Sequence, residues 1–510
     1  MESFAIKRYI ELPLPHESDT RADRERILDA VGADNVQMTL RTMQKLYPAL
    51  QDAGYKITLT LCPGERGFDI VNVEAGDTTD ALYGFALDVG STTLQMALID
   101  MNSGKTLCEH GASNSQRALG DDILTRIIAV KSDGTNLQKL QALVLGDIRA
   151  LIQRCCADAG ILPSQIAAMT IGGNTTMMHF LLGCDPWLVF QSPYTPVFYN
   201  PGIIPAWELG LDLNCNLFIM PAVANYLGGD ITSGLLNTDI DTREDMAMFL
   251  DIGTNGELAL GCKGMLLVGA GAAGPALEGA VSQSGMLSEP GGIDHVRIDE
   301  NNVLHVETIG NLPPKGICGS GIIDLIAQGY LAGWINGNGT LNPEASGCIK
   351  SVWDDEKNRH IPAIEYAVGE CGPLYFTQDD IHEYILCKAA AHTMVKTLMD
   401  ASGITAADIG AFYLAGGFGT HYDLESAITV GLYPDLPRDK FVVLGNASLE
   451  GCKRLLLDRN CLNRLQTLLD SAVYVQFSEM DKFLENMVAA QFLPHTDGAM
   501  YPSVHTRVKT

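Results

Sequence analysis

Two stretches far apart in the chain follow the same plan. Each has an apolar run that ends in an aspartate, then a turn rich in glycine and hydroxyl or amide residues, then a second apolar run. The first stretch is 85–99, with Asp88, and the second is 246–260, with Asp251. Each pattern predicts a β-hairpin with a tight turn whose backbone N–H groups can face an anion. Because the plan occurs twice, we expect a duplicated fold in which the two turns approach each other across a cleft.

The two turns carry residue types that suit a phosphate group. Glycine leaves no Cβ to keep backbone N–H groups away from an anion. The carboxylates of Asp88 and Asp251 suit Mg²⁺, which keeps most of its waters and needs only one or two acids beside phosphate oxygens. One such hairpin alone would be an ordinary Asp-Gly turn, but the second copy favours a shared polyphosphate site. The turn residues expected at the phosphates are Gly90, Ser91, Thr92, Thr93, Gly253, Thr254 and Asn255.

A third glycine-rich turn comes late in the chain. It follows the strand-like run 412–414 and reads Ala415-Gly416-Gly417-Phe418-Gly419. Adjacent glycines allow a base or a ribose to lie directly against the backbone. In third place after two Asp-x-Gly hairpins, this turn is the expected contact for the nucleoside.

This order of motifs resembles the acetate and sugar kinase, Hsp70 and actin superfamily, in which two hairpins bind phosphate and the late Gly-Gly turn contacts adenosine. More narrowly, it resembles the reductive activators of corrinoid proteins. These are ATPases that return an inactivated cob(II)alamin methyltransferase partner to cob(I)alamin. The resemblance runs from about Ile6 to the C-terminus, and four motifs carry it: 171–177, 271–279, 317–321 and 415–419.

The resemblance implies an α/β fold, a duplicated ribonuclease-H-like ATPase with two lobes and a small N-terminal α+β domain. The expected divisions are 1–80 for the small domain, 81–245 for the first lobe and 246–510 for the second. Two helical patterns and two strand-like runs before residue 80 fit the small domain. From 336 to 373 the sequence predicts mostly loop, with one strand near 348–352.

The resemblance also implies site residues. Asp230 is a candidate for orienting the attacking water, with N-capping as the alternative role. A glycine loop at 268–274 is expected to precede a helix that carries Glu278 at the nucleotide, and Gly319-Ser320-Gly321 repeats this loop-to-helix plan. The further residues expected at the nucleotide are Gly274, Glu278, Gly319, Ser320, Gly321, Gly416, Gly417 and Gly419.

For function, the resemblance implies an activator that uses ATP and Mg²⁺, docks on a corrinoid protein and promotes reduction of Co(II). A plant-type [2Fe–2S] domain usually precedes this region in such proteins, whereas here no cysteine precedes Cys62. We therefore expect no intrinsic ferredoxin-type cluster and a separate ferredoxin-like electron donor. The resemblance alone implies a homodimer. Three alternatives stay open: a small-molecule kinase, a nucleotide-dependent filament or scaffold, and a cluster-bearing activator of acyl-CoA dehydratases or reductases.

Charge and hydropathy exclude several classes of partner. The net charge of −27 argues against nucleic acid and anionic membrane, which are bound chiefly through positive charge. No apolar run approaches the roughly 18–20 residues of a spanning helix, and the N-terminus lacks the pattern of a secretory signal. The sequence thus predicts a cytoplasmic protein.

The 13 cysteines show no metal-binding spacing. No Cys-x-x-Cys occurs, and the one close pair is the adjacent Cys155-Cys156, which is badly placed for two ligands on one ion. The spacing therefore predicts no local zinc site or ferredoxin-type cluster. Ligands brought together by folding, or across a dimer, remain open.

Overall fold

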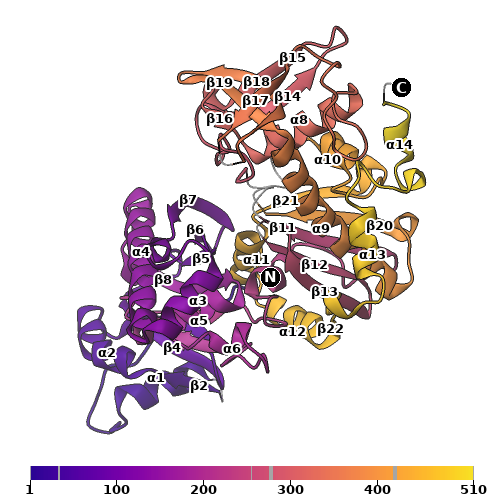
Figure 1. Cartoon of the computed structure of the whole chain (residues 1–510). Coiled ribbons are helices and arrows are strands. Elements are labelled where there is room, and N and C mark those ends of the chain that lie inside the picture. The colour runs from indigo at the N-terminus through magenta and orange to yellow at the C-terminus, as the bar shows by residue number, and fades with distance from the viewer. Residues whose placement is uncertain are drawn as a thin grey trace. The chain divides into compact units, whose positions relative to one another are not determined.

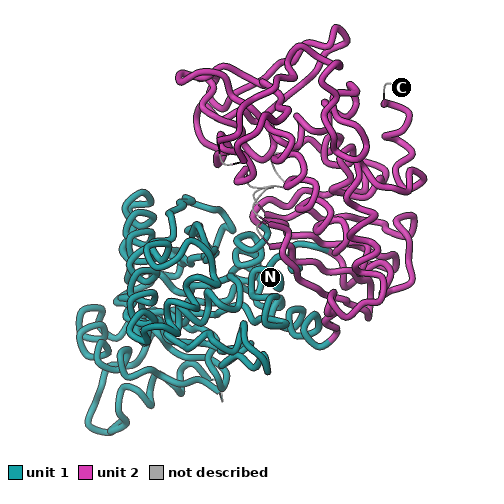
Figure 2. The backbone as a smooth tube through the Cα atoms, in the orientation of Figure 1, with its two compact units in different colours: residues 1–238, 447–470 teal, residues 239–446, 471–510 magenta. Residues whose placement is uncertain are grey.

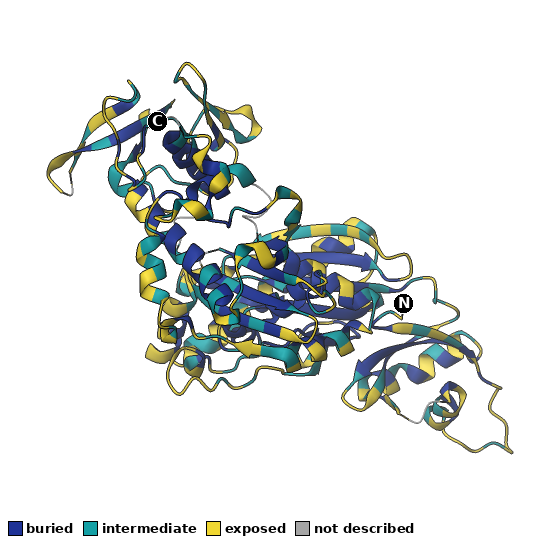
Figure 3. Cartoon of the chain, turned by 90° about the vertical axis from the view of Figure 1, so that its right-hand side faces the viewer, coloured by how far each residue is buried: buried dark blue, intermediate teal, exposed yellow. Residues whose placement is uncertain are grey.

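The computed structural model describes residues 2–32, 35–253, 255–274, 279–355, 357–416 and 422–508. Contacts divide the chain into two compact units (Figure 2). Unit 1 holds residues 1–238 and 447–470, and unit 2 holds 239–446 and 471–510. In each unit the buried residues concentrate on the central strands and on the helix faces turned toward them (Figure 3). Within the described residues, no helix is both long and apolar enough to span a membrane.

Unit 1 begins with the small α+β domain that the sequence predicts. Its four-stranded sheet has the order β1-β3-β4-β2, and its own apolar core includes Ile27, Leu50 and Leu59. Thr39 starts the second helix by accepting a hydrogen bond from the Thr42 N–H. The elements are β1 (Ile6–Glu11), α1 (Asp23–Val31), β2 (Val36–Met38), α2 (Leu40–Asp52), β3 (Lys56–Gly64) and β4 (Gly67–Ala75).

The main sheet of unit 1 has six strands in the order β7-β6-β5-β8-β10-β9. The first three strands form an antiparallel meander, and β8 and β10 then continue in parallel with β5. The strands are β5 (Tyr83–Val89), β6 (Thr93–Asp100), β7 (Lys105–Ser113), β8 (Ile166–Gly173), β9 (Ile203–Pro205) and β10 (Asn216–Ile219). The helices are α3 (Ile123–Ser132), α4 (Thr135–Ala159), α5 (Thr175–Leu182), α6 (Trp187–Phe190), α7 (Gly229–Leu235), α11 (Ala447–Leu457) and α12 (Cys461–Ser471).

Unit 2 repeats this plan. Its main sheet, whose six strands are labelled in Figure 1, has the order β21-β20-β11-β12-β13-β22. The meander β13-β12-β11 followed by the parallel strands β20 and β21 therefore matches β7-β6-β5-β8-β10 of unit 1. This repeat confirms the predicted duplicated α/β fold. The strands are β11 (Met246–Ile252), β12 (Asn255–Cys262), β13 (Met265–Ala272), β20 (Ile409–Ala415), β21 (Phe441–Gly445) and β22 (Ala472–Tyr474).

Between β13 and β20, unit 2 carries two further three-stranded sheets and the long helix α9 (Gln378–Ser402). Thr377 and Asp380 form a capping box at the start of α9, and Gly403 ends it. The remaining elements are β14 (Gly292–Ile298), β15 (Leu304–Thr308), β16 (Gly316–Ile317), α8 (Gly319–Leu331), β17 (Ile349–Asp354), β18 (Arg359–Gly369), β19 (Gly372–Thr377), α10 (Leu424–Val430), α13 (Phe483–Ala489) and α14 (Pro502–His505).

Three features differ from the sequence-based predictions. The stretch 336–373, predicted as mostly loop, contains β17, β18 and the start of β19. The predicted glycine loop at 268–274 is strand as far as Ala272, because Gly269 and Gly271 make room for Phe477 and Met394, which a Cβ would approach to 2.3 and 2.5 Å. Residues 447–470, assigned by the sequence to the second lobe, pack in unit 1.

Candidate functional site

The first Asp-x-Gly hairpin lies in unit 1, between β5 and β6. Asp88 is the next-to-last residue of β5 and pairs with Gln95 of β6. The turn closes through the Gly90 N–H, which donates to the Thr93 carbonyl at 3.0 Å. A Cβ on Gly90 would lie 2.7 Å from that same carbonyl oxygen, so the turn requires glycine here.

Two buried polar side chains, Asn114 and Arg126, donate hydrogen bonds to carbonyl oxygens of this turn. The Asn114 amide donates to the Gly90 carbonyl at 2.9 Å, and its backbone N–H donates to Thr92 O at 2.8 Å. The guanidinium of Arg126 donates to the Ser91 carbonyl at 2.6 Å. These bonds occupy carbonyl oxygens of the turn and so fix its backbone. The N–H groups of the turn other than that of Gly90 are then the part able to meet an anion.

The C-terminal end of β8 lies beside Asp88, since Gly172 is its partner across the β5–β8 pair. A Cβ on Gly172 would come within 2.5 Å of Ser448 Oγ and 3.2 Å of Cys452 Sγ, both on α11. Burial, together with the charge of Asp88, raises the pKa of the Cys452 thiol. Helix α11 thus packs directly against the strand ends that carry the candidate site.

Asp230 lies in the first turn of α7, and its Oδ1 accepts the Ile231 N–H at 2.9 Å. Burial and the neighbouring charge of Asp88 raise the pKa of Asp230 to about 7. The helix is capped by Gly228, so the alternative that Asp230 serves as the N-cap is wrong. Unit 1 therefore brings Asp88 and Asp230 into electrostatic contact, an arrangement that suits a divalent cation or a water held between acids.

The second hairpin, in unit 2, repeats the plan of the first with a turn that is one residue shorter. Asp251 pairs with Glu257, and the Gly253 N–H donates to the Asn255 carbonyl at 2.7 Å. Gly416, at the end of β20, has φ +86°, and a Cβ there would lie 2.7 Å from Asp251 Oδ1. The late glycine turn therefore begins in contact with Asp251. The candidates Thr254, Glu278, Gly417 and Gly419 lie outside the described residues.

The remaining glycine-rich candidates also lie in unit 2. Gly274 has φ +93° and leaves room for the Cys387 thiol, which a Cβ would approach to 2.6 Å. Gly319, Ser320 and Gly321 form the first turn of α8, as the loop-to-helix plan predicts, with Cys318 as the N-cap residue.

A pocket of about 990 Å³ lies against this first turn. The Oγ of Ser320 and the Oδ1 of Asp324 are buried in its wall without a hydrogen-bond partner among the described residues. The other carboxylate oxygen of Asp324 lies 3.2 Å from His295 Nδ1, and burial raises the pKa of Asp324. Unpaired buried polar atoms are costly, so these two oxygens are suited to meet a polar ligand.

Sequence reasoning missed Asn114, Arg126 and Asp324. The first two act through main-chain carbonyls of a turn that is distant in sequence, which no local pattern reveals. Asp324 could have been found from the sequence, because it is an acid inside the apolar run Ile322–Ala327. Burying an acid costs free energy unless it is paired, so an acid in such a run indicates a partner or a ligand.

Models of one protein family match nearly the whole chain. Three RACo family regions match in order: the linker region over residues 1–80, the middle region over 83–243, and the C-terminal domain of RACo, the ASKHA domain, over 245–505. The corrinoid activation enzyme RamQ of Eubacterium limosum is 29% identical over 442 residues, 84% of this chain and 73% of that protein. A Co(II) methylated amine-specific corrinoid protein reductase of Methanosarcina barkeri is 24% identical over 402 residues, 75% of this chain and 71% of its own length.

A solved structure, a reductive activator for corrinoid, iron-sulfur protein, is similar over nearly the whole chain. It aligns with a TM-score of 0.87 and 33% identity, covering 99% of this chain and 81% of that one. The similarity therefore includes both main sheets and the small N-terminal domain.

Proposed function

The chain belongs to the RACo family, and from this premise we propose that it is an ATP-dependent reductive activator that docks on a corrinoid protein and promotes reduction of its cob(II)alamin to cob(I)alamin. The observation that carries the proposal is the full-length similarity to a reductive activator for a corrinoid protein, at a TM-score of 0.87. The corrinoid activation enzyme and the corrinoid protein reductase named above support the same substrate class.

Two hairpins of the same construction support ATP as the nucleotide. Each closes its turn through a glycine N–H that bonds a carbonyl two or three residues ahead, and each carries an aspartate before that glycine. We propose that Asp88 and Asp251 bind one Mg²⁺ on the triphosphate, with the N–H groups of both turns at the phosphate oxygens. Bound Mg²⁺ would neutralise charge on the phosphates.

Asp230 is the proposed residue that orients the attacking water. Its carboxylate lies close enough to Asp88 for the charge of one to raise the pKa of the other. Gly416, against Asp251, begins the turn proposed for the nucleoside, and Ser320 at the start of α8 offers a buried hydroxyl to the same ligand.

Reduction of Co(II) is difficult because an axial ligand favours the oxidised state. A docking protein that binds the ligand-free corrinoid better raises the cobalt potential. For one electron, about 1.4 kcal/mol of differential binding corresponds to about 59 mV. A coupling of roughly 3 kcal/mol, which is within the usual allosteric range, therefore shifts the potential by over ~100 mV. The electrons are proposed to come from a separate ferredoxin-like donor, and the active form to be a homodimer.

The test follows the loss of cob(II)alamin on a corrinoid protein with an external reductant, with and without Mg-ATP. We expect a faster loss with Mg-ATP and release of inorganic phosphate. Asp88→Asn should lower the ATP-stimulated rate by at least roughly 100-fold, since one metal ligand is removed. Asp121→Asn, a surface acid whose side chain is 84% exposed, should leave it unchanged. Equal rates with and without Mg-ATP would contradict the proposal, and a phosphorylated metabolite would favour the kinase alternative.

A further inference from the structure

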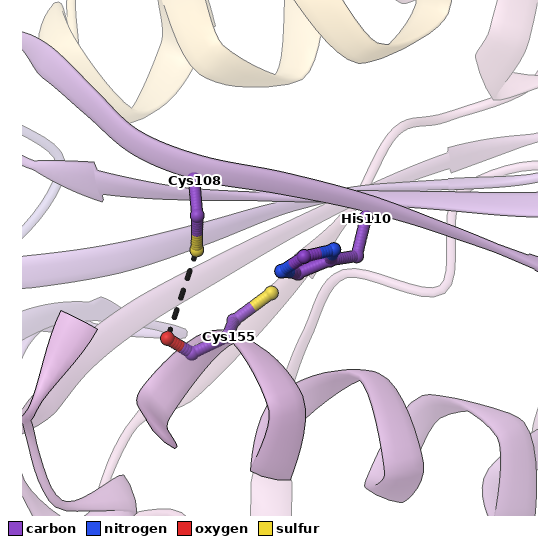
Figure 4. A group of neighbouring side chains, drawn as sticks. All are labelled: Cys108, His110 and Cys155. Carbon is purple, nitrogen blue, oxygen red and sulfur yellow. Dashed lines mark hydrogen bonds between the residues drawn. The ribbon is translucent and has the colours of Figure 1, made fainter. Parts of the chain in front are cut away.

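Strand β7 forms one edge of the main sheet of unit 1, and its side chains alternate between two faces. Glu109 points to one face, where it pairs with Lys453 of α11. Cys108 and His110, on either side of it in sequence, point to the opposite face, toward α4 (Figure 4). The period of the strand thus places a thiol and an imidazole side by side.

Helix α4 supplies a second thiol at the same place. The Sγ atoms of Cys108 and Cys155 and one ring nitrogen of His110 all lie within 4.8 Å of one another. The Cys108 thiol donates to the main-chain carbonyl of Cys155 at 3.6 Å, which holds the strand against the helix. One turn further along α4, Asp158 Oδ2 lies 2.6 Å from His110 Nε2. The three donors therefore come from two elements, and Cys155 lies about 45 residues beyond Cys108 and His110 in the chain, so the spacing of the cysteines gives no sign of the cluster.

Two thiolates and an imidazole are the donors that Zn²⁺ binds in proteins. Tetrahedral Zn²⁺, with bonds of about 2.3 Å to sulfur, keeps its ligand atoms about 3.7 Å apart, so shifts on the order of 1 Å close these side chains around the ion. Cys155 is fully buried, whereas the His110 side chain is 15% exposed and Asp158 reaches solvent at 52%. An ion therefore has a path of entry along the His110 side of the cluster.

We propose that Cys108, His110 and Cys155 form a site for Zn²⁺ or a similar thiophilic divalent cation. Binding replaces the thiol protons of both cysteines with bonds to the ion, and two protons are released to solvent. The ion ties an edge strand to the helix that covers it. Residue Asn114, which holds the first Asp-x-Gly turn, directly follows β7, so the site stabilises the support of that turn. This inference does not depend on the proposed corrinoid chemistry.

The test uses the full chain, reduced and stripped with a chelator, then titrated with Zn²⁺ and separately with Co²⁺. We expect one tightly bound zinc per chain by elemental analysis, and with Co²⁺ a thiolate-to-metal charge-transfer band in the near ultraviolet. Cys108→Ser, Cys155→Ser and His110→Gln should each weaken binding by at least roughly 100-fold. The matched control is Cys156→Ser, which replaces the adjacent buried thiol outside the cluster and should retain the zinc and the band.

Asp158→Asn tests whether the carboxylate beside His110 contributes to the site. We expect a loss of roughly 10- to 100-fold in zinc affinity with the charge-transfer band retained. His110→Gln keeps the test decisive if a cysteine variant fails to fold, because this side chain is at the rim of the cluster. Zinc bound equally by all variants, or no charge-transfer band in the reduced wild type, would overturn the proposal. A Cys108–Cys155 disulfide in the protein prepared without reductant, with no zinc uptake after reduction, would overturn it in favour of a redox pair.

Discussion

The pKa of a single side chain in this molecule depends on its place at the end of a helix or strand, and Asp230 is the clearest case. It sits in the first turn of α7, and both burial and the charge of Asp88 disfavour its ionised form. A carboxyl with a raised pKa binds a proton more readily in the folded than in the unfolded chain. It therefore stabilises the fold below its ordinary pKa and loses that contribution as pH rises through its folded value.

This predicts a pH-dependent difference between the wild type and Asp230→Asn. Between about pH 4 and pH 7, without nucleotide and with a chelator present, the wild type should lose on the order of 2–4 kcal/mol of unfolding free energy relative to the variant. Urea unfolding at several pH values measures it. Asp121→Asn, at the surface, should track the wild type throughout, and a difference for Asp230→Asn that stays constant with pH would contradict the assignment.

At the scale of elements, α9 fixes the last part of the chain through one buried lysine. The Lys388 ammonium donates all three of its protons to main-chain carbonyls, those of Ala490 and Phe492 at 2.6 Å and of Pro494 at 2.7 Å. These bonds attach the segment after α13 to the middle of α9 without any acid partner among the described contacts of this lysine.

Lys388→Met should therefore cost about 2–4 kcal/mol of unfolding free energy, since three carbonyls, two of them in buried contacts, lose their donor. Hydrogen exchange should rise first in residues 490–494. Lys396→Met is the matched control on the same helix. Its ammonium pairs with Asp400 at a partly exposed position, so that change should stay within about 1 kcal/mol. Equal losses for the two variants would show that the carbonyl contacts do not anchor the segment.

Helices and strands were predictable where capping or turn residues mark their ends in the sequence. Thr377 and Gly403 predict both ends of α9, and the repeated aspartate predicts both hairpins. Prediction was wrong at 268–272, because Gly269 and Gly271 serve to admit Met394 and Phe477 and not to turn the chain. For the site, the sequence pattern predicted the acids and glycines. It did not predict Asn114 and Arg126, which bond the first Asp-x-Gly turn only through tertiary contacts. The sharing of one Mg²⁺ by Asp88 and Asp251 remains a prediction.

At the scale of the whole molecule, unit 1 is completed by residues from late in the chain. Helix α11 buries Leu449, Cys452 and Leu455 in unit 1, where it packs on α7 and on β5. A fragment of residues 239–510 would leave this face uncovered. Unit 2 keeps its own core, which includes Leu250, Ile323 and Phe412.

We therefore predict that the fragment 239–510 associates with itself and binds a hydrophobic dye, while its far-ultraviolet circular dichroism still shows the folded sheet of unit 2. Co-expression with residues 1–238 should suppress both effects by covering α11. Gel filtration and dye fluorescence measure the outcome. A monomeric fragment without dye binding would contradict the role assigned to residues 447–470.

The division of the chain also sets an order of assembly during synthesis. Strands β5 to β10 leave the ribosome some two hundred residues before α11, the helix that packs against the strand ends beside Asp88. Unit 1 must therefore wait, with an apolar surface uncovered, until nearly the whole of unit 2 has been translated. We expect a chaperone to bind the nascent chain at that stage, because the uncovered apolar surface of unit 1 is prone to aggregation.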